Sequence, residues 1–310
     1  MKVAASSSRL LLSLLYTVIV TVVGVLVQQY LSPSSSSSSS SHDKSILELV
    51  VRPEVGMESV GGMQSIKEEL MRGIVWPLKK PDVFFRLPSL RPPSAFLLHG
   101  PPGTGKTMLA KAVAGEAGVP LLCLHAAAIE NKWFGESAKL LASAFRVARE
   151  QLAPCVVFFD EIDSLGRARS EQDQACVYSL KCELLRHLDG AGTDLSRPVT
   201  VMACTNHLSS LDTALKRRFG RHLPIPLPDE ESRRSILTVL LHDEANPPSS
   251  SCLTKLVKHT HGSSGSDLAR LVHDANQLRL SSLDYESITT ADEATAQLGR
   301  LHCRHFAIPR

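Results

Sequence analysis

The stretch "AFLLHGPPGTGKT" (residues 95–107) decides the fold of this 310-residue chain. Its apolar first part predicts a buried strand, and the residues after it, "MLAKAVAGEAG" (108–118), have helical spacing. Gly100 to Thr107 match the pattern G-x-x-x-x-G-K-[ST] between a strand and a helix, the context that this pattern requires. Glycines let backbone N–H groups turn inward around phosphates, and the helix N-terminus adds positive potential. The stretch therefore predicts an α/β fold with a site for nucleotide phosphates.

Individual residues of this loop have separate expected tasks. The Lys106 amine is placed to reach the β- and γ-phosphates, and the Thr107 hydroxyl is placed to bind Mg²⁺. This chemistry implies ATP and Mg²⁺ as the ligands. We expect the nucleotide to contact a continuous run formed by Gly100, Pro101, Pro102, Gly103, Thr104, Gly105, Lys106, Thr107 and Met108.

A second apolar run, "CVVFF" (155–159), ends in two acids, Asp160 and Glu161. Parallel strands buried on both faces have such sequences, and open α/β sheets bind ligands at the carboxyl ends of their strands. We therefore expect Asp160 to hold Mg²⁺, directly or through water, and Glu161 to polarise the attacking water as a base. The alternative, an acid-rich surface turn, is disfavoured by the phosphate loop upstream. The two motifs together predict ATP hydrolysis.

Further polar groups follow a third apolar run, "PVTVMACT" (198–205). Asn206 follows it directly, where an amide can orient water or sense the γ-phosphate, although asparagine also caps many strands. The short helical segment "LDTALKRRFG" (211–220) carries Arg217 and Arg218 at its end. A guanidinium on the developing phosphoryl charge raises the rate about 10³- to 10⁵-fold. The competing interpretation is a solvated helix end that complements its own dipole; we expect both arginines and Asn206 to act in hydrolysis.

Charge and cysteine content narrow the classes of function. The chain has 34 basic and 31 acidic residues, and only 5% of it is aromatic. The folded region has no long basic stripe with interleaved aromatic residues, so no nucleic-acid partner is expected. The seven cysteines are scattered, mostly within apolar runs, which favours reduced, buried thiols. The group His302, Cys303 and His305 lacks zinc-site spacing, and we expect no metal there.

An uncharged apolar run, Leu10 to Val27, lies near the N-terminus. Eighteen helical residues span about 27 Å, close to the hydrocarbon thickness of a bilayer. A signal peptide is disfavoured by the length of the run and by the missing cleavage site, and a buried core helix by its lack of amphipathic character. We therefore predict one transmembrane anchor over residues 10–31, followed by a flexible serine-rich linker over residues 32–56.

Together, these motifs resemble those of the AAA family of ring-forming ATPases. The resemblance runs from about Glu58 to the C-terminus and includes the entry segment "VGGMQSIKEELMRGIVWPL" (60–78) and "HGSSGSDLARLVHDA" (261–275). It implies an α/β AAA+ P-loop NTPase core over residues 57–227, in which a parallel sheet is flanked by helices. A small helical lid domain is implied over residues 228–310.

The same resemblance assigns roles to the second half of the chain. Gly265 and Ser266 are implied to line the far side of the nucleotide. Ser266 and Asp267 suit the start of a helix, which continues with the apolar stripe Leu268, Leu271, Val272 and Ala275. In the family, arginine fingers reach the ATP site of the neighbouring subunit, so Arg217 and Arg218 imply a homo-hexameric ring.

Two adjacent aromatic residues stand in "NKWFGES" (131–137), between an apolar stretch and a segment with helical spacing. The simple explanation is that one or both rings pack beneath the loop. The AAA resemblance implies instead a loop that faces the central pore of the ring. Lys132, Trp133 and Phe134 would then grip a passing polypeptide irrespective of its sequence.

The segment "KWFGES" also resembles the pore loop of thorase-type AAA ATPases, which extract mislocalised tail-anchored proteins from mitochondrial outer membranes and peroxisomes. This implies membrane-protein clients, a single-pass anchor in the mitochondrial outer membrane or, alternatively, the peroxisomal membrane, and a cytosolic ATPase domain. By the positive-inside rule, Lys2 and Arg9 would keep the N-terminus in the cytosol and place the folded part across the membrane. That rule describes insertion by the secretory route, which a mitochondrial outer-membrane anchor need not follow. Two alternatives stay open: a severing or disassembly ATPase of the katanin–spastin type, and a membrane scaffold that binds nucleotide without hydrolysing it.

Overall fold

The structure is a computed structural model that describes residues 41–84, 91–125, 137–166, 171–189, 197–242, 244, 246–281 and 301–306. The chain divides into two units, Met1–Lys44 and Ser45–Arg310. The predicted anchor over residues 10–31 lies outside the described residues, as does the linker before Ser41. From residue 41 to residue 56 the structure differs from the predicted flexible linker, because this part contains a helix, Ser41–Leu47, and a strand of the sheet, Val50–Val51. None of the helices that the structure describes is long and apolar enough to cross a membrane.

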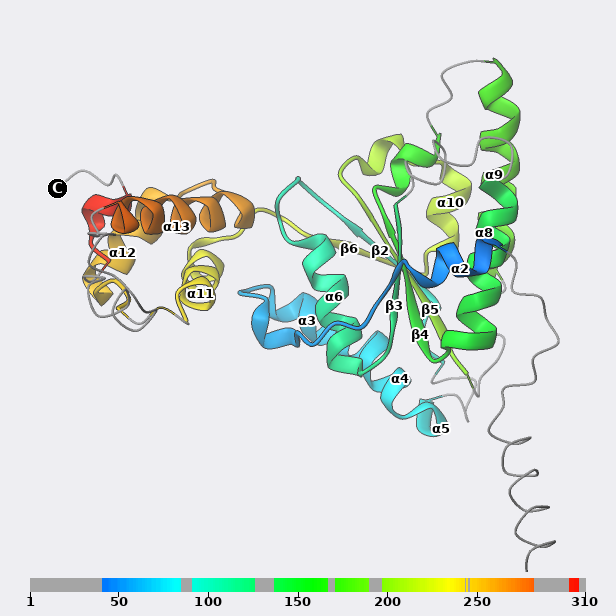
Figure 1. The fold of residues 1–310 in the computed structure, drawn as a ribbon, viewed down its shortest axis with the longest axis horizontal. Helices are drawn as coiled ribbons and strands as arrows, with labels where there is room; N and C mark the ends of the chain where they lie inside the picture. Colours follow the sequence, from blue (N-terminus) through cyan, green and yellow to red (C-terminus); the bar gives the residue numbers. More distant parts are fainter. Residues whose placement is uncertain are drawn as a thin grey trace, which may run out of the picture. The chain divides into compact units, whose positions relative to one another are not determined.

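A six-stranded sheet with the order β1-β3-β4-β5-β2-β6 forms the centre of the second unit (Figure 1). The strands from β2 to β6 are parallel to their neighbours, but β1 pairs antiparallel with β3, with Val50 opposite Leu122. The sheet is therefore mixed, and the prediction of a parallel sheet is wrong at this edge. Parallel neighbours need a crossover connection, usually a helix, and no such connection joins β1 to a parallel neighbour. The strands are β1 (Val50–Val51), β2 (Ala95–His99), β3 (Leu121–His125), β4 (Cys155–Asp160), β5 (Val199–Thr205) and β6 (Arg221–Pro224).

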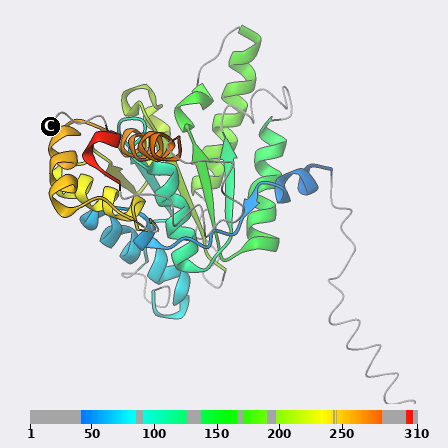
Figure 2. The ribbon, with the colours of Figure 1, turned by 60° about the vertical axis from the view of Figure 1, so that its left-hand side comes forward.

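Helices cover both faces of this sheet (Figures 1 and 2). Successive strand residues point to opposite faces, so Phe96 and Phe158 belong to one apolar core while Leu97 and Val157 belong to the other. The first core is closed by α3 (Gln64–Leu70), a π-helical turn (Met71–Val75), α4 (Trp76–Lys79) and α6 (Lys106–Ala117). The second core is closed by α8 (Ser137–Val147), α9 (Glu171–Asp189) and α10 (Thr213–Arg218). The shorter elements are α2 (Ser41–Leu47), η1 (Met57–Ser59), α5 (Pro81–Phe84), η4 (Ala148–Leu152), η5 (Ile162–Gly166) and η6 (Leu208–Ser210).

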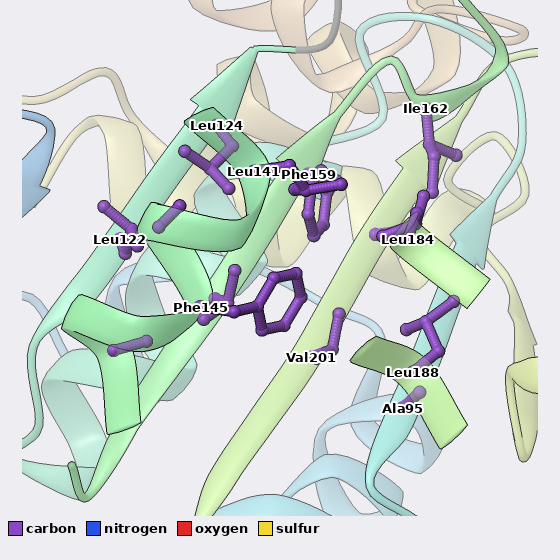
Figure 3. Packing of buried hydrophobic residues seen from close by; sticks show 14 of the residues in the cluster. Ala95, Leu122, Leu124, Leu141, Phe145, Phe159, Ile162, Leu184, Leu188 and Val201 are labelled. Atoms are coloured by element: carbon purple, nitrogen blue, oxygen red, sulfur yellow. The ribbon is translucent and has the colours of Figure 1, made fainter. Parts of the chain in front are cut away.

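The packing beneath α8 and α9 fixes the central strand β4 (Figure 3). The Phe145 ring of α8 stacks on Phe159 of β4, with centroids 6.1 Å apart, and on His187 of α9, with centroids 4.3 Å apart. Both phenylalanines are fully buried, and each such side chain contributes about 1.5–3 kcal/mol of burial free energy. The two acids at the end of β4 therefore project from a firmly held strand.

The C-terminal helices enclose a third apolar core of their own. Leu268, Val272 and Ala275 are buried in it, and Leu271 packs against it, which confirms the predicted apolar stripe. The domain boundaries over residues 57–227 and 228–310 stay predictions. The helices are α11 (Glu230–Leu240), α12 (Ser250–His259) and α13 (Gly265–Leu280), with a 3₁₀ turn, η8 (Cys303–Phe306), packed against them.

Helix α13 begins where the sequence predicts a helix start, but with a different cap. The N-cap is Ser264, whose hydroxyl accepts a hydrogen bond from the Asp267 N–H at 3.3 Å. The Asp267 carboxylate accepts one from the Ser264 N–H at 3.0 Å, which completes a capping box. Ser266, expected to share in starting the helix, donates its own N–H to the Gly103 carbonyl at 3.0 Å.

The structure pairs Cys252 of α12 with Cys303 of η8 as a disulfide, with a Cα–Cα distance of 5.6 Å. The sequence favoured reduced, buried thiols, and this pair departs from that expectation. The two residues are 51 positions apart in sequence, and only the packing of η8 against α12 brings them within the distance that a disulfide requires.

Candidate nucleotide site

Three neighbouring strands deliver the predicted reactive groups to one edge of the sheet. β4, β5 and β2 are adjacent, and their carboxyl ends lead to Asp160, Asn206 and Gly100. Because the strands are parallel, these ends lie at the same edge. The fold therefore assembles the site from three sequence motifs that are far apart in the chain.

The phosphate loop needs glycine at particular positions. At Gly100, φ is +153°, and a Cβ atom there would lie 2.0 Å from the Ile225 carbonyl oxygen. Gly105 has φ +91° and caps the N-terminus of α6 with left-handed backbone. Side chains rarely adopt such conformations, so glycine is what lets the loop turn tightly into the helix.

The Lys106 side chain is held inside this loop. It is 7% exposed, and its Nζ donates to the Gly100 carbonyl at 2.9 Å and to the Pro101 carbonyl at 2.7 Å. Burial lowers the pKa of the amine, while the charges of Asp160 and Asp163 act to raise it. The amine is therefore already directed at the loop into which phosphates would enter.

The Thr107 hydroxyl and the Asp160 carboxylate, two oxygen ligands suited to a cation, lie beside the Lys106 side chain. The Thr107 hydroxyl donates to Asp160 Oδ2 at 3.0 Å, and the Cys204 thiol donates to Asp160 Oδ1 at 2.7 Å. A hydroxyl and a carboxylate are hard ligands, and Mg²⁺ usually takes one or two such groups from the protein together with water and phosphate oxygens. The residues present therefore fit Mg²⁺.

Glu161 and Asn206 flank this pair. Glu161 has φ +53°, a left-handed conformation that is uncommon for a residue with a side chain and costs of order 1 kcal/mol. Asn206 Oδ1 is buried and has no hydrogen-bond partner within the described part of the chain. An acid on strained backbone and an amide oxygen without a partner are both features of sites that act on a ligand.

These residues line a cavity of about 510 Å³, within the range of small-molecule sites. The structure brings most of the predicted nucleotide contacts together there, while Gly100 and Pro101 are not among the described residues that line it. The predicted residues on the cavity wall are Pro102, Gly103, Thr104, Gly105, Lys106, Thr107, Met108, Asp160, Glu161, Asn206, Gly265 and Ser266.

Sequence reasoning missed much of the apolar wall. Val60 and Met63, from the entry segment, line the cavity together with Ile236 and Leu240 of α11 and Ala269 of α13. The entry-segment resemblance was a signal for Val60 and Met63. The two α11 residues carry no motif, and only the position of α11 beside the phosphate loop reveals them.

The two predicted arginines are not among the described residues that line this cavity. Arg217 and Arg218 are exposed at the end of α10. The Nε of Arg218 contacts Asp189 Oδ1, at the end of α9, at 2.5 Å. The chain's own nucleotide site is thus built without these guanidinium groups.

The predicted pore-loop residues Lys132, Trp133 and Phe134 fall outside the described residues. The structure does show their flanks: β3 ends at His125, and α8 begins at Ser137. The helical spacing after "NKWFGES" is therefore confirmed, the apolar stretch before it forms β3, and the role of its aromatic residues stays a prediction.

Comparison with known proteins assigns the class. A family model described as "ATPase family associated with various cellular activities (AAA)" matches residues 96–227. The crystal structure of the FIGL-1 AAA domain in complex with ADP superposes with a TM-score of 0.72 at 32% identity, covering 89% of this chain and 90% of that one. This chain belongs to the AAA family of ATPases.

Particular relatives come from several branches of this family. The chain is 39% identical over 268 residues to the cell division cycle protein 48 homolog of Archaeoglobus fulgidus, covering 83% of this chain and 35% of that protein. It is 36% identical over 237 residues to the outer mitochondrial transmembrane helix translocase of Danio rerio, covering 76% of this chain and 65% of that protein. The chain spans 35% and 43% of the length of the first two curated relatives that it matches.

Proposed function

We propose that this chain hydrolyses ATP at the cavity that the phosphate loop and the carboxyl ends of β4 and β5 help to line. The observation that carries this proposal is the convergence of Lys106, Thr107, Asp160, Glu161 and Asn206 on one cavity wall. These five groups supply an amine, a cation site, an acid and an amide. That set serves phosphoryl transfer to water.

Each group has a task that its position supports. Lys106 would bind the β- and γ-phosphates, and Thr107 and Asp160 would hold Mg²⁺, whose charge would neutralise that of the phosphates. The Glu161 carboxylate accepts the proton of the attacking water, and the Asn206 amide orients this water. Hydrolysis breaks the bond between the γ-phosphorus and the bridging oxygen and releases ADP and inorganic phosphate.

The guanidinium group that stabilises the developing phosphoryl charge is supplied by a second copy of the chain. Arg217 and Arg218 are exposed and are not among the described residues that line the chain's own cavity, so a neighbouring subunit is their proposed target. A closed ring of identical subunits, a homo-hexamer in this family, gives every site one such neighbour.

The proposed work of this motor is the extraction of mislocalised tail-anchored proteins from the mitochondrial outer membrane. Its support is the apolar span over residues 10–31 and the 36% identity to a protein named as an outer mitochondrial transmembrane helix translocase. Lys132, Trp133 and Phe134 would grip the client and thread it through the pore. Exposing an apolar anchor to water costs about 25 cal/mol per Å², so repeated cycles of hydrolysis are required.

The first experiment measures ATP turnover by the full-length chain in liposomes at increasing protein density. The rate per subunit should rise with density, because each site needs a neighbour, and Glu161→Gln should lower kcat at least about 100-fold. The exposed Glu150→Gln is the matched control. Turnover that survives Glu161→Gln, or no turnover at any density, would refute the proposed mechanism.

The second experiment tests extraction with a tail-anchored reporter in the same liposomes. Trp133→Ala should preserve ATP turnover and abolish release of the reporter. If the protein disassembled a soluble, filament-forming client and did not release the membrane reporter, the severing or disassembly alternative would be favoured. ATP binding without turnover would favour the scaffold.

A further inference from the structure

Three segments that carry the proposed reactive groups meet at Thr205, the last residue of β5. Thr205 is completely buried. Its carbonyl accepts a hydrogen bond from the N–H of Gly100, where the phosphate loop begins, at 3.3 Å. Its hydroxyl donates to Asp163 Oδ1 at 2.7 Å and accepts from the His207 N–H at 3.0 Å.

These hydrogen bonds involve the segments that carry Glu161 and Asn206, the two groups proposed to act on the attacking water. Asp163 lies in the 3₁₀ turn that follows Glu161, and the Ser164 N–H of the same turn donates to the Glu161 carbonyl at 2.9 Å. The hydrogen bond from the His207 N–H to the Thr205 hydroxyl spans Asn206, which lies between these two residues in the sequence. It therefore closes a small loop that contains Asn206. The bond between Thr205 and Asp163 therefore ties the turn that carries Glu161 to the loop that carries Asn206.

We propose that Thr205 and Asp163 are positioning residues that hold Glu161 and Asn206 at a fixed separation during hydrolysis. This inference rests on the proposed ATP hydrolysis and deepens it. Neither Thr205 nor Asp163 is among the described residues that line the cavity, so both act through their neighbours. A short hydrogen bond from a buried hydroxyl to a carboxylate is among the stronger kinds and restricts both partners.

The consequence for kinetics follows from where the bond acts. The Lys106 amine and the loop glycines, which contact the nucleotide, do not depend on the Thr205 hydroxyl. Loss of that hydroxyl should therefore leave nucleotide binding intact and misplace the two groups that act on water. Misplacement of reacting groups lowers kcat with little effect on KM.

The test compares Thr205→Val, which keeps the shape and the carbonyl, with Thr205→Ser, which keeps the hydroxyl. In the full-length chain in liposomes, Thr205→Val should lower kcat about 10-fold or more and change the KM for ATP less than about twofold. Thr205→Ser should restore kcat to within about threefold of the wild type. Thr200→Val is the matched control, because Thr200 lies buried on the same strand.

Four outcomes would overturn the proposal. A Thr205→Val variant with wild-type kcat would show that the bond positions nothing. Equal losses of kcat in the Val and Ser variants, or a loss shared by Thr200→Val together with a lower Tm, would show a merely structural role. Wild-type protein without turnover would refute the ATPase proposal and this one together, whereas active wild type beside an unaffected Thr205→Val refutes only the positioning role.

Discussion

At the scale of single residues, the nucleotide site depends on side chains that no motif names. The sequence pattern identifies Lys106, Thr107 and Asp160 because their spacing is fixed by the strand and the loop. It does not identify Cys204, which lies on the neighbouring strand and donates to Asp160 at 2.7 Å. That contact arises from the parallel pairing of β4 with β5, a relationship that a linear sequence does not contain.

A prediction at this scale concerns the Mg²⁺ dependence of hydrolysis. Burial, followed by the hydrogen bond to Asp160, raises the pKa of the Cys204 thiol, so the thiol stays protonated and donates at neutral pH. Cys204→Ala should raise the Mg²⁺ concentration for half-maximal turnover about 3- to 10-fold, because Asp160 loses a donor that orients it. Titration of turnover with Mg²⁺ at saturating ATP measures the effect.

Cys155→Ala is the control for this prediction. Cys155 is also buried, at the other end of β4, where its thiol donates to the Ala148 carbonyl at 3.5 Å. Burial raises the pKa of this thiol to about 12. Equal Mg²⁺ requirements in the two variants would contradict a specific role of Cys204.

At the scale of helices and strands, the sequence predicts the core well and the edges less well. The strands β2, β4 and β5 and the helix α6 lie where their apolar runs and the glycine loop predict, because burial on both faces leaves a clear pattern. The antiparallel edge strand β1 was not predicted, since its pairing depends on tertiary contacts. The cap of α13 was misassigned because "SSGSD" offers more than one serine, and only the backbone geometry selects Ser264.

The capping box of α13 predicts a pH dependence. Hydrogen bonds from the Ser264 hydroxyl, followed by that from its N–H, lower the pKa of Asp267 below its ordinary value of 3.8. A group whose pKa is lowered by folding stabilises the folded state above its unfolded pKa, and this stability is lost as the pH falls through the folded pKa. The Tm advantage of wild type over Asp267→Asn should therefore be constant from about pH 7 to 5 and shrink below about pH 4.

Thermal unfolding from pH 7 to pH 3 measures this difference. The exposed Asp274, on the same helix, provides the control variant Asp274→Asn. A Tm difference between wild type and Asp267→Asn that persists unchanged to pH 3 would contradict the role of the Asp267 charge.

At the scale of the whole molecule, the disulfide between Cys252 and Cys303 connects η8 to α12 across 51 positions of the chain. In the chain-entropy model, a cross-link over a loop of this length contributes up to about 4 kcal/mol to the free energy of unfolding. A reducing agent should therefore lower the Tm of the wild type. The variant Cys252→Ser should have the lower Tm already and should not respond to the reducing agent.

Cys182→Ser is the control for this measurement, because Cys182 is an exposed free cysteine. Its Tm should match that of the wild type and fall in the same way on reduction. A wild-type Tm that is unaffected by reduction would contradict a stabilising cross-link.

Assembly of the proposed ring can be tested by mixing two inactive chains. Glu161→Gln lacks the proposed base, and the double variant Arg217→Ala/Arg218→Ala lacks the proposed fingers, so each alone should be inactive. In a random mixed ring about a quarter of the interfaces combine an intact Glu161 with intact arginines, and turnover should reappear. If the mixture stays as inactive as its components, the arginines do not act between subunits; Asp189→Ala tests whether the Arg218 ion pair alone matters.

The pairing of β1 with β3 has a mechanical consequence. A tether to a membrane would enter the sheet through β1, where Val50 and Val51 pair with Leu122 and Leu121. In the sequence, residues 126–130 connect β3 to "NKWFGES". The force of a pulled client and the resistance of the tether would therefore act on two adjacent strands. These strands lie at one edge of the sheet, separated from β5 and β2 by β4. Tension between the membrane tether and the client would then act on β1 and β3, at the edge of the sheet. It would not act on β2 and β5, which lead to the phosphate loop and to Asn206.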